Sequence, residues 1–143
     1  MVFLKEIEMK PQDIIAHASR VMRSLGTGHR ECVYHKALCA SLSDKRVSHR
    51  SEVVTPIMFL GECVGIGRAD IIIDNIVIEI KANSKKPGAA SGQLKKYIES
   101  IKNVEGKKDV IGMVVNFNQN TGLVEGLLEK EDVKRSRFFH NKK

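Results

Sequence analysis

The stretch from residue 68 to residue 82, RADIIIDNIVIEIKA, constrains the fold of this chain more than any other. It is the most apolar run of the sequence, and the pair Asp74-Asn75 interrupts it near the middle. Asp and Asn tolerate the positive φ that a tight two-residue turn between strands requires. The stretch is therefore predicted to be a β-hairpin, with strands at 68–73 and 76–82.

The charged residues of this hairpin fall on one side of it. With the turn at 74–75, Ile71 opposes Ile78 and Asp70 opposes Glu79. Because side chains alternate along a strand, Asp70, Glu79 and Lys81 share one face. The other face is lined by isoleucines, namely Ile71, Ile73, Ile76, Ile78 and Ile80. Two carboxylates about 5 Å apart repel by roughly 3 kcal/mol at an effective dielectric of about 20, so something must offset the repulsion.

Several arrangements would offset that repulsion. A Mg²⁺ ion can be held by one or two carboxylates, with water and phosphate oxygens completing its shell. A proton shared by the pair, or the positive charge of Arg68 or Lys81, would act in the same direction. A solvated sheet face carrying mixed charges explains the pattern equally well. The hairpin alone leaves these alternatives open.

The remaining elements are predicted from apolar periodicity and turn residues. Helices are expected at 11–25, 29–43 and 93–102. Further strands are expected at 53–56, 57–60, 63–67, 110–117 and 123–128. A turn at Gly61-Glu62 is expected before the strand at 63–67, which continues into the strand at 68–73. This order predicts an α/β (α+β) fold, a mixed sheet flanked by helices.

Length and charge bound the organisation of the chain. Its 143 residues suit one domain, which we place at 1–132. The net charge is +7, but the segment 133–143 contributes five basic residues and no acid. That basic tail is either a solubilising or a disordered end. The other 19 basic and 17 acidic residues nearly balance, so pI alone does not argue for a nucleic-acid partner.

The sequence also excludes some classes of protein. No apolar run approaches the ~20 residues that span a bilayer, and the first ten residues do not form a signal peptide. An intracellular setting, cytoplasmic or nuclear, is therefore expected, without a membrane partner. Cys32, Cys39 and Cys63 show no CxxC spacing, so neither a disulfide framework nor a zinc site is expected, and these residues are predicted to be buried.

Three motifs of the sequence resemble those of a known superfamily. Asp70 followed by Glu79-Ile80-Lys81 is the D-(x)n-E-x-K signature of the PD-(D/E)XK nucleases. The run GHRECVY, Gly28 to Tyr34, resembles the motif of the GxxExxY family within that superfamily. The run QLKKY, residues 93–97, is similar to the QxxxY motif of RecB-like nucleases. The resemblance covers roughly residues 11 to 120, with Ala69 standing where the superfamily name has proline.

The resemblance implies a restriction-endonuclease-like core and a metal site. Asp70, Glu79 and the Ile80 carbonyl would hold Mg²⁺, or Mn²⁺ in its place, with Glu31 as an outer or occasional inner ligand. Lys81 would activate the attacking water or stabilise charge on the phosphate. For Glu31 the structural alternative is a first-turn acid that the helix dipole favours.

Further residues are implied as positioning or substrate-binding groups. Gln93 and Tyr97 share a helix face and would position the lysine or a phosphate, or simply pack that helix on the sheet. Five basic residues are candidate phosphate contacts or solvated side chains: Arg68, Lys85, Lys86, Lys95 and Lys96.

The function that these motifs imply is a Mg²⁺-dependent nuclease acting on nucleic acid, on DNA rather than RNA. Two alternatives are a nuclease-derived module that binds nucleic acid without cutting it, and a protein-interaction domain. A domain of this size covers little nucleic acid, which favours a homodimer or a larger complex, although no residue of the sequence identifies the interface.

Overall fold

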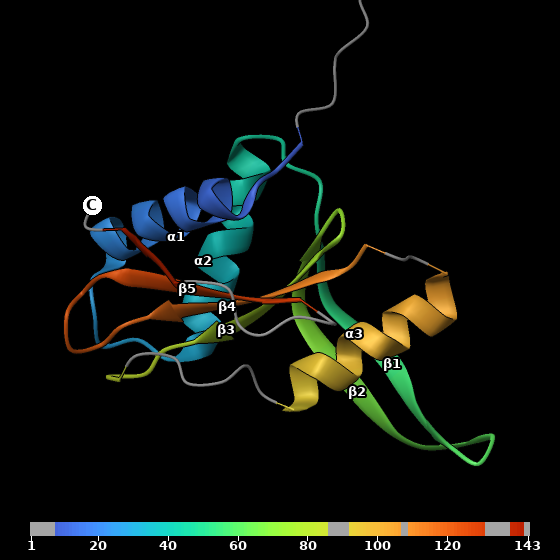
Figure 1. Ribbon diagram of the computed structural model, residues 1–143. Coiled ribbons are helices and arrows are strands. Elements are labelled where there is room, and N and C mark those ends of the chain that lie inside the picture. The colour runs from blue at the N-terminus through green and yellow to red at the C-terminus, as the bar shows by residue number, and fades with distance from the viewer. Residues whose placement is uncertain (1–7, 86–91, 107–108, 131–137, 142–143) are drawn as a thin grey trace, which may run out of the picture.

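A mixed β-sheet with helices on both faces forms the core of the protein (Figure 1). The computed structural model describes residues 8–85, 92–106, 109–130 and 138–141. The strands lie in the order β1-β2-β3-β4-β5-β6. β3 and β4 are parallel, and the other neighbouring strands are antiparallel. The predicted fold class is therefore confirmed.

Along the chain, two helices precede three strands, and a third helix precedes three more strands. The helices are α1 (Pro11–Leu25), α2 (Glu31–Asp44) and α3 (Gly92–Glu105). The strands are β1 (Arg50–Phe59), β2 (Glu62–Ile73), β3 (Ile76–Lys81), β4 (Ile111–Phe117), β5 (Val124–Lys130) and β6 (Phe138–Asn141). Because β3 and β4 are parallel, they need a crossover connection, and α3 supplies it. In the part of the chain that the structure describes, no helix is long and apolar enough to cross a membrane.

Two apolar cores lie on opposite faces of the sheet. α1 and α2 cover the face that carries Ile71, Ile73, Ile76, Ile78 and Ile80, as the hairpin pattern predicts. α3 covers the other face and packs on Ile72 and Val77. The charged face of the hairpin is thus not open along its whole length, because α3 buries the part nearest the turn. Each fully buried aliphatic side chain contributes roughly 1.5–3 kcal/mol.

Two glycines allow the helices to approach the sheet closely. A Cβ atom at Gly112 of β4 would lie 2.6 Å from Cδ1 of Ile98 in α3. A Cβ atom at Gly126 of β5 would lie 2.7 Å from Cδ1 of Ile15 in α1. A larger residue at either position requires one of these side chains to move.

The register of the β2–β3 hairpin agrees with the prediction over three pairs. Ile73 pairs with Ile76, Ile72 with Val77 and Ile71 with Ile78. The turn lies at Asp74-Asn75, and Asp74 has a φ of 51°. The local chemistry of the turn was sufficient to place these six residues.

The prediction for β1 was wrong in two respects. Val53 to Leu60 was divided at Pro56, whereas β1 runs through Pro56 without interruption. β1 is an edge strand, and there a residue without an N–H group can be accommodated. The turn that follows lies at Leu60-Gly61 rather than Gly61-Glu62, with φ values of 51° and 80°.

Smaller differences concern the ends of elements and the cysteines. α2 begins at Glu31, two residues later than predicted, and the short strand β6, which the sequence did not predict, pairs with β5. Cys32 and Cys63 are exposed and Cys39 is half-buried, so the expectation of buried cysteines was wrong.

Candidate active site

The ladder between β2 and β3 opens at Asp70. Beyond the pair Ile71–Ile78, the backbone amide of Ile80 donates a hydrogen bond of 2.7 Å to Oδ2 of Asp70. In a strand the N–H and C=O of one residue point to the same neighbouring strand, so the Ile80 carbonyl faces this opening as well. On the other side of β2, the pairing with β1 also skips Asp70: Glu52, between the paired residues Ser51 and Val53, has a φ of 52°. Asp70 therefore sits where the regular sheet is interrupted.

A cavity of about 250 Å³ occupies this opening. It is lined by Glu31, Arg68, Ala69, Asp70, Ile78, Glu79, Ile80, Lys81, Leu94 and Tyr97. Seven of these are residues that the sequence analysis singled out. The cavity thus brings α2, β2, β3 and α3 together around one small volume.

The cavity is lined by unequal numbers of acidic and basic side chains. Three acidic side chains, Glu31, Asp70 and Glu79, face two basic ones, Arg68 and Lys81. The Lys81 ammonium lies 3.4 Å from Oε1 of Glu79, and the Glu79 side chain is only 15% exposed. Lys81 is therefore a counter-charge for Glu79, as one of the alternatives drawn from the hairpin requires. The lining still carries one more acid than base, which favours a cation.

The donor set of the cavity fits a hard divalent cation. As placed, the described residues contain no group of three or more His, Cys, Asp or Glu side chains that would hold a metal ion. Mg²⁺ does not require such a cage, because it binds through one or two carboxylates and keeps water and phosphate oxygens as its other ligands. Asp70, Glu79 and the Ile80 carbonyl offer oxygen donors of that kind. One hydrogen bond to Asp70 does not exhaust its carboxylate, which has about four acceptor sites.

The position of Glu31 depends on a hydrogen-bonded link before α2. Tyr34 is fully buried and stacks on Phe117 at a centroid distance of 4.5 Å. Its hydroxyl donates to the Gly26 carbonyl at 2.7 Å, and Gln119 Nε2 donates to that hydroxyl at 3.1 Å. The Gly28 amide in turn donates to Oε1 of Gln119 at 2.6 Å. These bonds fix the link between α1 and α2, and so the place where α2 begins.

Asn116 holds the loop that follows β3. It is fully buried, and its Oδ1 accepts a 2.9 Å hydrogen bond from the Asn83 amide. Its Nδ2 donates to the Lys85 carbonyl at 3.1 Å and to Oε1 of Glu125 at 3.2 Å. Sequence analysis missed Asn116 and Gln119. A polar residue at the end of an apolar strand, as in IGMVVNF, was the available signal for Asn116.

α3 contributes Tyr97 to the cavity wall. Tyr97 is 3% exposed, and its hydroxyl donates to the backbone carbonyl of Val53. This contact anchors α3 to β1, which is the packing role considered for Tyr97. Gln93 belongs to α3, four residues earlier, but its side chain lies outside the described part of the chain.

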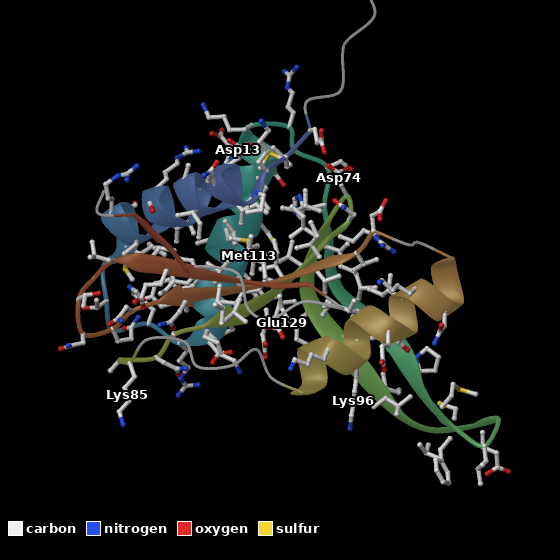
Figure 2. All side chains as sticks on the ribbon, viewed as in Figure 1. Asp13, Asp74, Lys85, Lys96, Met113 and Glu129 are labelled. Atoms are coloured by element: carbon white, nitrogen blue, oxygen red, sulfur yellow. The ribbon has the colours of Figure 1, made fainter. Side chains whose placement is uncertain are left out.

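The candidate phosphate-binding lysines that the structure describes do not line the cavity. The side chains of Lys85 and Lys96 are exposed and point into solvent, and the two residues lie at separate positions on the surface (Figure 2). Lys95 lies 3.3 Å from Oε1 of the buried Glu129. Lys86 falls outside the described residues. Of the four basic candidates that the structure describes, Arg68 alone lines the cavity.

The chain was compared with solved structures, curated proteins and family models. A solved structure described as "Crystal structure of SSO0001" is similar at a TM-score of 0.33 and 20% identity, covering 78% of this chain. The chain spans 63% of the length of that structure's chain. Among curated proteins, none matches at a significant level. The PD-(D/E)XK nuclease superfamily matches over residues 8–127, most of the chain. With its fold and its D-(x)n-E-x-K residues at one cavity, the chain belongs to the PD-(D/E)XK nuclease superfamily.

Proposed function

We propose that this protein hydrolyses phosphodiester bonds of nucleic acid at the cavity between β2 and β3. One observation carries the proposal: Asp70, Glu79 and Lys81 line the same cavity at the point where the ladder opens, in a chain of a nuclease superfamily. The assignment to the GxxExxY branch rests on the motif from Gly28 to Tyr34. The preference for DNA rests on the likeness of Gln93 to Tyr97 to the QxxxY motif of RecB-like nucleases.

The proposal includes a Mg²⁺ ion, which Mn²⁺ can replace. Asp70, Glu79 and the Ile80 carbonyl would hold it, with Glu31 as an outer ligand at the first turn of α2. When bound, such an ion polarises the phosphodiester and lowers the pKa of its water. The fit of the oxygen donors and the excess of acids over bases around the cavity support this assignment.

Lys81 has a separate role in the proposal. Its ammonium is held beside Glu79 by the 3.4 Å ion pair, so it stays at the cavity rather than extending into solvent. There it would orient the attacking water or stabilise the negative charge that develops on the phosphate. Arg68, on the cavity wall, would contact a neighbouring phosphate. Gln93 and Tyr97 would position Lys81 or the substrate phosphate.

The test is cleavage of plasmid, single-stranded DNA and RNA with Mg²⁺, with Mn²⁺ and with EDTA. Wild-type protein should cut only with metal, and Asp70→Asn and Lys81→Met should each reduce the rate roughly 100-fold or more. Asp74→Asn is the matched control for the first variant, since Asp74 is an exposed acid in the turn of the same hairpin. Lys36→Met, an exposed lysine of α2, is the control for the second.

The outcome separates the three functional readings. Cutting that survives both variants at the control rate contradicts the assignment of the site. Nucleic-acid binding without metal-dependent cutting by any variant identifies a binding module instead. Absence of both binding and cutting would leave only a role in protein interaction.

A further inference from the structure

The β1–β2 hairpin extends from the molecule past α3 as an apolar arm, residues Val54–Ile66 (Figure 1). Among the described residues, eight large hydrophobic side chains are exposed, and seven of them lie in this arm. The eighth is Leu25, at the end of α1. Single exposed hydrophobic residues are ordinary, but a contiguous group of this kind marks an interaction surface.

One face of the arm is uncovered. Pro56 pairs with Ile66 and Val54 with Arg68, two residues apart on each strand, so these side chains share one face, with Arg68 at its base. Val64 lies next to this face, where the register shifts. Val54, Val64 and Ile66 are 53%, 60% and 68% exposed. The helices on this side of the sheet, α1 and α2, pack over β3 to β6. This apolar face is therefore left without a covering helix in the described part of the chain.

The opposite face of the arm is held by α3. Ser100 Oγ donates to the Pro56 carbonyl at 3.0 Å, and Thr55 Oγ1 donates to Ser100 Oγ at 3.2 Å. These contacts fix the base of the arm to the body of the protein. The arm is thus a supported β-ribbon whose free face is presented in a defined orientation.

The turn at the tip carries a residue that folding does not explain. Leu60 is 87% exposed and has a φ of 51°, followed by Gly61 with a φ of 80°. Turns with two positive φ values favour Asn, Asp or Gly at the first position. Leu60 is unfavourable there both for its backbone and for its exposure, which indicates that its side chain serves a contact.

The charge of the arm selects the kind of partner. Glu62 is the only acidic or basic residue between Val54 and Ile66, although the chain as a whole has a net charge of +7. Arg68 pairs with Val54 at the base of the arm, and no cation lies beyond it. The outer arm is therefore poorly suited to phosphates, whose neutralisation by Lys and Arg dominates nucleic-acid binding. The fitting partner is a surface that is itself uncharged and apolar, and the same arm of a second copy has these properties.

The size of the arm also suits such a pairing. Its seven exposed hydrophobic side chains, on the two faces and at the tip, together present several hundred Å², the order of the ~800 Å² that each partner contributes to a standard interface. We propose that two copies of this chain associate through their arms as a twofold-symmetric dimer. In such a dimer the same patch serves both copies, so Val54, Ile66 and Leu60 contact their counterparts or near neighbours. The proposal does not depend on nuclease activity.

The test is sedimentation equilibrium of the full chain over micromolar concentrations, without metal or nucleic acid. The wild-type mass should approach twice 16.0 kDa as the concentration rises. Ile66→Asp and Leu60→Asn should each raise the dimer Kd roughly tenfold or more. Leu25→Asp is the matched control, since Leu25 is the one exposed large hydrophobic residue outside the arm in the described part of the chain. The dimer Kd of this variant should equal the wild-type value.

Leu60→Asn keeps the test independent of misfolding. Asn suits the left-handed backbone at this position, so at a concentration well below the dimer Kd, where both proteins are monomeric, the variant's Tm should equal or exceed the wild-type Tm. A wild-type protein that stays monomeric, or a dimer unaffected by both arm variants, overturns the proposal. Loss of nucleic-acid affinity in the arm variants of a monomeric protein would instead assign the arm to nucleic acid and would equally overturn it.

Discussion

The charged residues of the hairpin were predictable because their placement is a local matter. Asp74-Asn75 fixes the turn, and strand alternation then puts Asp70, Glu79 and Lys81 on one face. What the sequence did not indicate is that the ladder stops after Ile71–Ile78, so that Asp70 bonds the Ile80 amide. That break depends on how β2 bends away from β3, which no short pattern records.

Tyr34 supports the site through its hydroxyl, and Tyr34→Phe isolates that contribution. The ring would keep its stacking on Phe117, but the Gly26 carbonyl and Gln119 would lose a partner. The free energy of unfolding should fall by roughly 1–2 kcal/mol in urea denaturation. Because Gln119→Ala breaks the same network, the double variant should lose less than the sum of the two losses. Additive losses would show that the residues act separately.

His17 makes the stability of the α1–α2 pair depend on pH. Burial lowers the pKa of His17, and the positive charge of Arg20 lowers that pKa further. The folded state therefore favours the neutral ring, which is hydrogen-bonded with Ser41 at 2.8 Å. The neutral His17 ring contributes its full stabilisation above pH 6.5, the ordinary pKa of histidine. This stabilisation is lost as the pH falls through the lower pKa of the folded state.

The expected result is a difference between wild-type protein and His17→Gln. On going from about pH 7.5 to about pH 5, wild-type protein should lose more of its free energy of unfolding than the variant does. Urea denaturation at each pH measures both. Equal losses would mean that protonation of His17 is not coupled to unfolding.

At the scale of elements, local patterns succeeded where the chain is regular. α1 was placed correctly from its apolar spacing and from Pro11 and Gly26 at its ends. The prediction divides the segment of β1 at Pro56, because proline usually interrupts a strand. The sequence does not show that β1 is an edge strand, where proline can be accommodated. β6 is short and lies in a basic stretch without apolar alternation of useful length, so no periodicity marked it.

The loop after β3 depends on one buried amide, and Asn116→Ala tests it. The substitution removes the bonds to Asn83, Lys85 and Glu125. We expect the free energy of unfolding to fall by roughly 2–3 kcal/mol, because buried polar groups lose their partners. Asn120→Ala, at an exposed position in the next turn, should change it by less than about 0.5 kcal/mol. Chemical denaturation of both variants gives the comparison.

At the scale of the whole molecule, the cavity is a product of contacts that are distant in sequence. Glu31 lies at the cavity because the start of α2 is held by the hydrogen bond between Tyr34 and Gln119, which is 85 residues further along the chain. Glu79 and Lys81 belong to a strand whose parallel partner, β4, arrives only after the α3 crossover. The sequence names these residues through motif resemblance, but their convergence follows from topology.

The C-terminal segment contributes to the sheet, so its removal should have a structural effect. A chain ending at residue 132 lacks β6 and leaves β5 as an unpaired edge. We expect a lower Tm and more light scattering on heating than in the full chain. A chain ending at residue 141 retains β6 and should melt like wild-type protein. Equal melting of the shorter chain would show that β6 adds no stability.

The distribution of basic residues predicts unequal effects on nucleic-acid binding. If Lys85 and Lys96 each meet a phosphate, Lys85→Ala and Lys96→Ala should each reduce the salt slope of binding by roughly 1. Lys95→Ala should change the slope less, because Lys95 is engaged by Glu129. Fluorescence anisotropy over a range of salt concentrations measures the three slopes. A larger change for Lys95 than for Lys96 would contradict this order.

The hydrogen bond between the Ile80 amide and Asp70 has a spectroscopic consequence. A cation that takes Asp70 as a ligand competes for the same carboxylate that this amide uses. The amide resonance of Ile80 should then move on titration with Mg²⁺, whereas that of Ile78, bonded within the regular ladder, should move much less. The chemical shift of one backbone amide proton would thus report the occupancy of the metal site, without any substrate or catalysis.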